Sequence, residues 1–305
     1  MQRSVAMYDI IIIGAGPAGL TAAIYARRAA KTVLVLEASS YGGQIINTPD
    51  IENYPVAAHI SGFEFATNVY NQAVALGAEI KFEKALEIKN GDEKTVVTPR
   101  GEYASKAVII ATGSKNRKLG VEGEDMLVGR GISYCATCDG AFFKNKKVAV
   151  VGGGNTALED ALYLSDIAET VYLIHRRDSF RGEAATAEKL REKPNVKLVL
   201  NSVIKKLGYD KRLTGVTVEN KLGEQTELEV SGLFVAVGRI PETDSFKALA
   251  DTDASGYFAS SENCKTKTDG IFVAGDVRSK DVRQLVTATA DGAVAATEAV
   301  KYLNS

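Results

Sequence analysis

The sequence predicts an α/β protein built from two three-layer units of parallel strands and helices, the second unit inserted into the first. Two observations predict this architecture. A glycine-rich loop that follows an apolar run and opens a helical pattern occurs twice, at residues 14–19 and 152–157. After each copy, short strands alternate with turn signals and end in another apolar run, at residues 108–113 and 233–238. The chain therefore contains an internal duplication, each copy with a β-meander.

Length and composition agree with two domains. The 305 residues are too many for one small core, and 45% are hydrophobic and 25% charged, as in ordinary soluble proteins. The 37 basic and 38 acidic residues leave a net charge of −1, so nothing predicts binding to nucleic acid or to an anionic membrane. Three cysteines without the spacing of a disulfide scaffold are typical of a reducing compartment. We expect a cytoplasmic protein.

Residues 10–26 carry no charge and resemble a signal peptide or a short membrane span. Three glycines and Pro17 interrupt this run, Asp9 precedes it, and it is too short to cross a bilayer. We interpret it as a buried strand that runs into a helix.

The first copy has the pattern of a Rossmann-like dinucleotide site. Residues 8–13 form an isoleucine-rich run, as expected of a strand buried on both faces, and a second strand at residues 33–36 ends at Glu37. Between them, glycines allow a tight turn and the close approach of a pyrophosphate to the N-terminus of the helix. An acidic residue after the second strand accepts hydrogen bonds from ribose hydroxyls. The predicted contacts are Gly14, Gly16, Pro17, Ala18, Gly19 and Glu37.

Further features of the same copy identify the dinucleotide as FAD. Residues 42–44, Gly-Gly-Gln, form a second loop for close approach. A β-meander is expected over residues 78–110, with turns at residues 90–91 and 99–101, and it ends in the run 108–113. Near the C-terminus, a buried strand ends in an aspartate placed to bind a polyol, and the helix expected at residues 284–303 can face a flavin carbonyl with its N-terminus. The residues added to the predicted FAD site are Gly42, Gly43, Gln44, Ala111, Thr112, Gly113, Gly275 and Asp276.

The second copy differs from the first at the residue that follows its second strand. Its strands are expected at residues 148–151 and 171–174, with a meander at 196–230, and its phosphate loop contains Gly152, Gly154, Asn155 and Thr156. His175 stands where the first copy has Glu37, and Arg176, Arg177 and Arg181 follow. Arginines at this position accommodate a ribose 2′-phosphate, so the second copy predicts NADPH. The alternative is a solvated basic loop.

The order of these motifs predicts the domain boundaries. The FAD-binding domain is discontinuous and comprises residues 1–116 and 243–305, because its last strand follows the second copy. The NADPH-binding domain comprises residues 117–242 and carries the cysteine pair. Two connections between domains suit a hinge.

Cys135 and Cys138 are followed at once by Asp139. Cysteines at this spacing can form a disulfide where the chain turns, and the carboxyl adds a proton donor or acceptor for a thiolate. A CxxC near a dinucleotide-binding pattern is typical of redox chemistry. Half of a zinc site is one alternative, although Cys264, His59 and His175 lack ligand spacing. An inert buried pair is the other.

The motifs occur in the order Gly-Ala-Gly-Pro-Ala-Gly, Gly-Gly-Gln, Ala-Thr-Gly, Cys-Ala-Thr-Cys-Asp-Gly, Gly-Gly-Gly-Asn-Thr-Ala, His-Arg-Arg and Ala-Gly-Asp, with Arg283 and Gln284 after the last. Across nearly its whole length the chain resembles the low-molecular-weight thioredoxin reductases. The placement of Cys-Ala-Thr-Cys-Asp is the most specific part of the resemblance.

The resemblance implies a role for individual residues. Cys138 would face the flavin, Cys135 would attack the disulfide of thioredoxin, and Asp139 would be the general acid–base. Arg283 and Gln284 would lie at the flavin ring, and Asn53 would contact the flavin. Arg130 would contact the other domain. A homodimer is also implied.

The implied function is thioredoxin-disulfide reductase, in which electrons pass from NADPH to FAD, to the cysteine pair and to a thioredoxin-like protein, with domain rotation between the half-reactions. A flavin-dependent dithiol oxidase is an alternative that would not need Arg176, Arg177 and Arg181. A peroxiredoxin-reducing flavoprotein is another, usually with an extra N-terminal redox domain. A non-enzymatic nucleotide sensor would not need the cysteine pair.

Overall fold

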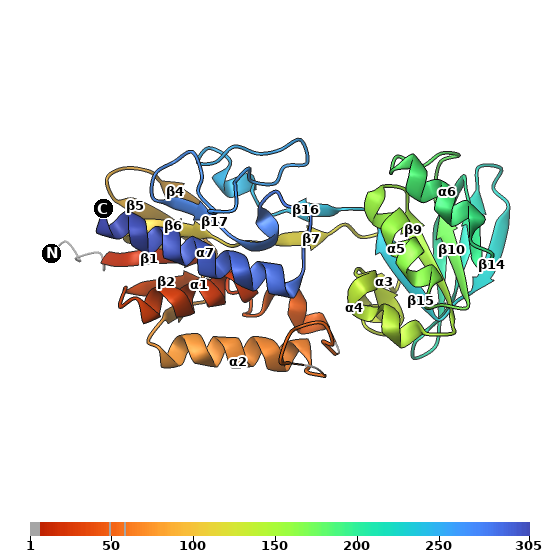
Figure 1. Ribbon diagram of the computed structural model, residues 1–305, viewed down its shortest axis with the longest axis horizontal. Coiled ribbons are helices and arrows are strands. Elements are labelled where there is room, and N and C mark those ends of the chain that lie inside the picture. The colour runs from red at the N-terminus through yellow and green to blue at the C-terminus, as the bar shows by residue number, and fades with distance from the viewer. Residues whose placement is uncertain (1–6, 49, 58) are drawn as a thin grey trace. The chain divides into compact units, whose positions relative to one another are not determined.

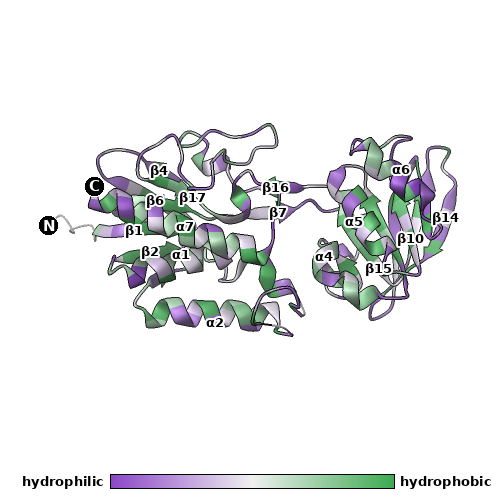
Figure 2. Ribbon diagram, in the orientation of Figure 1, coloured by the Kyte–Doolittle hydropathy of each residue, from purple (hydrophilic) through white to green (hydrophobic). Residues whose placement is uncertain are grey.

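The computed structural model describes residues 7–48, 50–57 and 59–305, which form two compact units. We call Met1–Lys115 together with Ile240–Ser305 the flanking unit, and Asn116–Arg239 the inserted unit. Each unit contains a set of parallel strands with helices against one face (Figure 1) and an antiparallel meander, so the predicted α/β fold class is confirmed. The most hydrophobic segments are the central strands of each sheet (Figure 2).

The sheet of the flanking unit has the order β3-β2-β1-β6-β5-β4, and β17 pairs with β6 on the same side as β5. Its strands are β1 Met7–Ile13, β2 Val33–Leu36, β3 Glu79–Lys81, β4 Glu87–Lys89, β5 Lys94–Thr98, β6 Gly101–Ile110 and β17 Ile271–Val273. Strands β4, β5 and β6 form the predicted meander. Strand β3 does not belong to it, because β3 pairs in parallel with β2; this part of the prediction was wrong.

Alternate residues of β1 enter two different cores. Ile10 and Ile12 face the helices, and Ile11 and Ile13 face the meander side, all within 4% of full burial. The helices of this unit are α1 Pro17–Arg28, α2 Gly62–Ala75 and α7 Leu285–Asn304, with short 3-10 turns η1 Gly43–Asn47, η3 Asp244–Phe246 and η4 Gly275–Val277. A strand buried on both faces explains why the run 8–13 is continuously apolar.

The inserted unit has a parallel sheet of order β11-β10-β9-β15-β8 and a separate antiparallel sheet of order β12-β13-β14. Its strands are β8 Ile132–Ser133, β9 Lys147–Gly152, β10 Thr170–Ile174, β11 Val196–Val199, β12 Ser202–Tyr209, β13 Leu213–Asn220, β14 Gln225–Glu229 and β15 Gly232–Ala236. Its helices are α3 Glu124–Leu127, α4 Ala136–Asp139, α5 Asn155–Ser165 and α6 Ala184–Glu192, with the 3-10 turn η2 Gly140–Phe143. The meander starts at Ser202 and not at Val196, because β11 pairs in parallel with β10.

The two units repeat one plan with one difference. Strands β1 and β2 pair up to Ile13 and Leu36, and β9 and β10 pair up to Val151 and Ile174. In the flanking unit the last meander strand, β6, continues into the parallel sheet, whereas in the inserted unit β15 is a separate strand. The segments that connect the units, β7 Ser114–Asn116 and β16 Arg239–Pro241, pair with each other. Within the described ranges, no helix is both long and apolar enough to cross a membrane.

Candidate functional site

The glycine-rich loop between β1 and α1 offers an anion site. Gly14 has a φ of 109°, and a Cβ there would lie 2.4 Å from the carbonyl oxygen of Ala111, so the loop requires glycine at this point. Helix α1 begins with Pro17 after an N-cap glycine, without a side-chain cap and without an acidic residue in its first turn. Its first N–H groups are therefore available to a phosphate, and the loop fits the pyrophosphate of a dinucleotide.

Glu37 directly follows β2 and contacts this loop. One carboxylate oxygen accepts a hydrogen bond from the Ala15 N–H at 2.8 Å, and the other accepts one from the Ser39 N–H at 2.9 Å. The Ser39 hydroxyl also donates to the second oxygen, at 3.4 Å, so the oxygen bonded to Ala15 keeps a lone pair that a ribose hydroxyl can use. The predicted second loop is brought to the same place, because the Gly42 N–H donates to the carbonyl of Ala15 at 2.8 Å.

Two further predicted segments meet this loop. The Ala111 N–H donates to the carbonyl of Ile13 at 2.8 Å, which places residues 111–113 beside the end of β1. Gly275 lies against the side chain of Ala18 in the first turn of α1. The sequence-predicted residues 14–19, 37, 42–44, 111–113 and 275 therefore form one continuous edge of the flanking unit.

A buried ion-pair network that the sequence analysis missed fixes the turn at Gly275. Asp291 on α7 accepts hydrogen bonds from the Gly275 N–H at 2.9 Å, from Arg278 at 2.8 and 2.9 Å, and from Lys280 at 2.9 Å. The side chains of Arg278, Lys280 and Asp291 are only 6%, 8% and 9% exposed. The available signal was an aspartate in the alanine-rich first half of this helix.

We expect Asp291→Asn to lower the free energy of unfolding by about 3–5 kcal/mol at pH 7, because two buried cations would lose their carboxylate. Burial raises the pKa of Asp291, but the hydrogen bonds from Arg278 and Lys280 outweigh it and hold the pKa below its ordinary value. A depressed folded-state pKa stabilises the protein above the unfolded pKa, and this stability is lost as the pH falls through the folded value.

Denaturant titrations between pH 7 and pH 3 measure this effect, and the difference between wild type and variant should shrink below about pH 4. Asp251→Asn is the matched control, since Asp251 pairs with Lys267 on the surface and is 67% exposed. The Asp251→Asn change should lower the free energy of unfolding by less than about 1 kcal/mol. An equal loss for the two variants would show that burial of the network contributes nothing.

Three residues predicted at the flavin ring lie together in the flanking unit. Gln284 is the N-cap of α7, and its side-chain oxygen accepts a hydrogen bond from the Asn53 amide at 3.3 Å. The guanidinium of Arg283 stacks on Tyr257, 3.9 Å from the ring centroid, and donates to the carbonyl of Arg278 at 3.2 Å. Tyr257 thus orients Arg283, a contact that the sequence could not indicate.

The loop after β9 is the second anion site. Helix α5 begins after Gly154 without a side-chain cap or an acidic residue in its first turn. The Arg181 N–H donates to the carbonyl of Gly153 at 2.7 Å, and the Glu183 N–H donates to the side chain of Asn155 at 2.9 Å. The segment that contains Arg181 is therefore attached to the phosphate loop, and this site fits a phosphorylated dinucleotide.

His175 lies beneath this loop. It is 6% exposed, its ring stacks on Phe180 at 5.5 Å, and a Cβ at Gly153 would fall 2.2 Å from the ring. Burial is the main cause that lowers the pKa of His175, so the ring is neutral near pH 7. The charge that could meet a 2′-phosphate comes from the exposed Arg176, Arg177 and Arg181.

Cys135 and Cys138 form a disulfide at the N-terminus of α4, with Cα atoms 5.3 Å apart. The sulfurs are bonded to each other, so the zinc alternative finds no support in this state. Cys264 belongs to the flanking unit and is fully buried. Burial raises the pKa of its thiol to about 12, which makes it an unreactive thiol.

Asp139 is the last residue of helix α4 and is hydrogen-bonded to Ser133. Ser133 was not among the residues predicted from the sequence. The Ser133 hydroxyl donates to Oδ2 of Asp139 at 2.6 Å. Burial raises the pKa of Asp139, and the hydrogen bond from Ser133 opposes this shift. A carboxyl that is protonated more readily than usual can serve as a proton donor beside a disulfide.

A second anchor holds the segment before Cys135. Glu124 is 3% exposed and accepts hydrogen bonds from the Leu119 and Gly120 N–H groups, each at 2.9 Å, and from the Tyr134 hydroxyl at 2.8 Å. Desolvation by burial is the main cause that raises the pKa of Tyr134, so its hydroxyl stays protonated. The turn that carries the cysteines is therefore tied to the start of the inserted unit.

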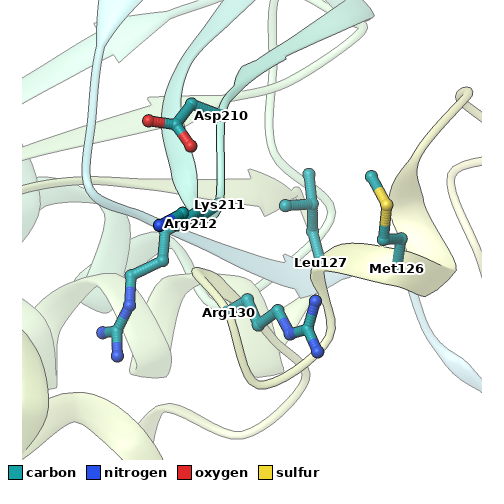
Figure 3. A pocket seen from close by; sticks show the side chains of 6 residues that line it. All are labelled: Met126, Leu127, Arg130, Asp210, Lys211 and Arg212. Atoms are coloured by element: carbon teal, nitrogen blue, oxygen red, sulfur yellow. The ribbon is translucent and has the colours of Figure 1, made fainter.

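A separate depression of about 470 Å³ is lined by Met126, Leu127, Arg130, Asp210, Lys211 and Arg212. Figure 3 shows Met126 and Leu127 on one helical segment, α3, and Asp210 in the turn between β12 and β13. Three cations and one carboxylate give it a positive charge. The contact of Arg130 with the other domain, implied by the resemblance, stays a prediction.

Comparisons with known proteins agree on one family. Residues 8–292 match the model of the pyridine nucleotide-disulphide oxidoreductases. A thioredoxin reductase of Treponema pallidum is 43% identical over 301 residues, 98% of each chain, and one of Bacillus subtilis is 41% identical over 300 residues, 97% of this chain and 95% of the relative. The crystal structure of thioredoxin reductase from Streptococcus pyogenes has a TM-score of 0.94 at 43% identity and covers 99% of each chain.

Proposed function

Because this chain belongs to the thioredoxin reductases, a family of pyridine nucleotide-disulphide oxidoreductases, we propose that it reduces a thioredoxin-like protein with electrons from NADPH. The observation that carries the proposal is the Cys135–Cys138 disulfide beside Asp139, in the same unit as a second dinucleotide loop. The cysteines would be the redox centre that exchanges with the partner. A homodimer, which the resemblance implies, and a cytoplasmic location, which the cysteine usage predicts, also belong to the proposal.

FAD would be held by the edge of the flanking unit. The first turn of α1 would bind the pyrophosphate, Glu37 the ribose, and Asp276 the polyol chain. When bound, FAD accepts a hydride from NADPH and passes two electrons to a disulfide. The remaining proposed contacts are Gly14, Gly16, Pro17, Ala18, Gly19, Gly42, Gly43, Gln44, Asn53, Ala111, Thr112, Gly113, Gly275, Arg283 and Gln284.

NADPH would be held by the inserted unit. The N-terminus of α5 and residues Gly152, Gly154, Asn155 and Thr156 would bind its pyrophosphate. Arg176, Arg177 and Arg181 would neutralise the 2′-phosphate, and His175 would support the loop from below without carrying charge.

We expect the double variant Arg176→Gln/Arg177→Gln to lose affinity for NADPH and keep that for NADH. Each charge-assisted contact to the 2′-phosphate contributes about 1.5–3 kcal/mol, which corresponds to roughly 10-fold to 150-fold per arginine. The measurement is KM for the two coenzymes. Arg191→Gln is the control, since Arg191 lies on α6 and pairs with Glu188. Equal losses for NADH and NADPH would contradict the assignment.

The residues around the disulfide can perform the exchange. Once reduced, Cys135 as a thiolate would attack the partner disulfide, form a mixed disulfide and release one partner sulfur. Cys138 would then attack Cys135, release the second partner sulfur and restore the intramolecular disulfide. Asp139, whose pKa burial raises, would supply or take up the proton of a leaving or attacking sulfur.

The test is an NADPH-oxidation assay with purified protein and two acceptors, thioredoxin and, separately, oxygen. We expect rapid turnover with thioredoxin and slow turnover with oxygen. The dithiol-oxidase alternative would give the opposite order. The names of the relatives also favour thioredoxin over a peroxiredoxin as the partner.

A further inference from the structure

Ser133 occupies the end of β8, the edge strand of the inserted sheet, and is 5% exposed. Its hydroxyl lies between two parts of the redox turn. It accepts a hydrogen bond from the Cys135 N–H at 3.0 Å and donates to Oδ2 of Asp139 at 2.6 Å. The carbonyl of Cys135 is also within 3.2 Å.

A hydroxyl has one proton to donate, so it cannot serve Asp139 and the Cys135 carbonyl at once. The contact to Asp139 is shorter, and a hydrogen bond to a carboxylate is about twice as strong as one between neutral groups. Ser133 therefore donates to Asp139 and accepts from Cys135 N. One oxygen of Asp139 is then fixed, while its other oxygen, Oδ1, is buried without a hydrogen-bond partner among the described residues.

We propose that Ser133 is a positioning residue of the reductase reaction: it holds the carboxyl of Asp139 in register with the backbone of Cys135, next to the disulfide. The proposal rests on the thioredoxin reductase function above. It assigns to β8 a part in the reaction that no motif indicates, since serine two residues before a cysteine has no spacing signature.

The proton balance gives Asp139 a defined task. Reduction of the disulfide breaks the bond between the two sulfurs and requires two electrons and two protons. The hydride of NADPH brings both electrons and one proton. When it is protonated, Asp139 supplies the second proton to the leaving sulfur and then recovers a proton from water. The step is fast only when the carboxyl is both protonated and oriented, and Ser133 controls the orientation.

The groups around Asp139 leave Ser133 as its main polar contact. Strand β15 and turn η2 carry no titratable side chain, and Tyr134 is held by Glu124. Helix α5 brings the ring of Tyr163 against Gly140, and it carries Asp160, whose pKa burial raises to about 7. Asp160 titrates near the working pH and therefore requires a control of its own.

The experiment compares the pH dependence of thioredoxin reduction by the FAD-loaded wild type, Ser133→Ala and Ser133→Thr. Activity that needs neutral Asp139 falls as the pH rises through its pKa. Loss of the Ser133 hydrogen bond removes a stabilising contact of the ionised carboxylate, so the descending limb of Ser133→Ala should move to higher pH. Its kcat should fall about tenfold at neutral pH with an unchanged KM for thioredoxin. Ser133→Thr keeps the hydroxyl and should restore both properties.

Three controls separate the outcomes. Ser165→Ala removes another buried serine of the inserted unit, whose hydroxyl bonds only a helix carbonyl, and should behave as wild type. Asp160→Asn should leave the descending limb in place. Flavin content and melting temperature report folding. If Ser133→Ala has the same kcat as wild type and the same descending limb in its pH profile of thioredoxin reduction, the inference is overturned. If wild type itself does not reduce thioredoxin, the proposed function is overturned instead.

Discussion

Cys138→Ser should abolish turnover with thioredoxin, by roughly three orders of magnitude, and should convert the protein into a trap for its partner. Cys135 can still attack the partner disulfide, but no second thiol remains to resolve the mixed disulfide. Non-reducing gels and mass spectrometry after incubation with thioredoxin should show a covalent complex through Cys135. Cys264→Ser is the control, because it removes the buried third cysteine and should leave turnover unchanged.

Cys135→Ser should be equally inactive but should not form that complex. It leaves Cys138 as a thiolate on the flavin side, which should appear as a long-wavelength absorbance band in the FAD-loaded protein. Cys138→Ser should lack the band. The reverse pattern, with trapping through Cys138 and the band in Cys138→Ser, would mean that the roles of the sulfurs are exchanged.

Cross-linking the inserted unit to the flanking unit should also cost nearly all activity. Residues 135–138 and the loop at Gly152 belong to the same inserted unit. In the proposed electron path both exchange electrons with one flavin, and Cys135 also reaches a protein partner. The paired connections β7 and β16 can absorb the dihedral changes of a rotation. In one orientation NADPH would reach the flavin and Cys135 would reach the partner. In the other orientation the disulfide would reach the flavin.

Two cross-linked forms separate these half-reactions. Locked with the disulfide at the flavin, the protein should lose reduction of FAD by NADPH. Locked in the other orientation, it should keep that step and lose thioredoxin reduction. A variant with only one of the two engineered cysteines should keep full activity. Each cross-linked form should regain full activity once the engineered cross-link is reduced. Full turnover in either locked form would refute the rotation.

The parts of the fold that were predictable from the sequence are those where a local residue pattern and its chemistry coincide. The predicted second strand, residues 33–36, matches β2 residue for residue, and the helix expected after the first glycine-rich loop is α1, because an apolar run and a glycine-rich helix start are local signals. The spacing of Cys135 and Cys138 allowed a disulfide among other possibilities, and the structure forms it. The matched register of Glu37 and His175 also survives, since each follows the last paired residue of its second strand.

Features that depend on distant partners were not predictable. Strands β3 and β11 were assigned to meanders because nothing local shows that each pairs in parallel with a Rossmann strand. Asp291 could not be linked to Gly275, Arg278 and Lys280 without the fold. Glu124 and Ser133 were missed because an isolated carboxylate or hydroxyl is ordinary until its acceptors and donors are placed.

The most direct test of the account is thiol mapping after anaerobic reduction of the FAD-loaded protein by NADPH. Without NADPH, an alkylating reagent should label no cysteine of the folded protein, because Cys135 and Cys138 are oxidised and Cys264 is buried. After NADPH, Cys135 and Cys138 should both become labelled, and excess oxidised thioredoxin added before the reagent should erase the labelling. Reduction of the flavin without any labelling of Cys135 and Cys138 would contradict the proposed path of electrons.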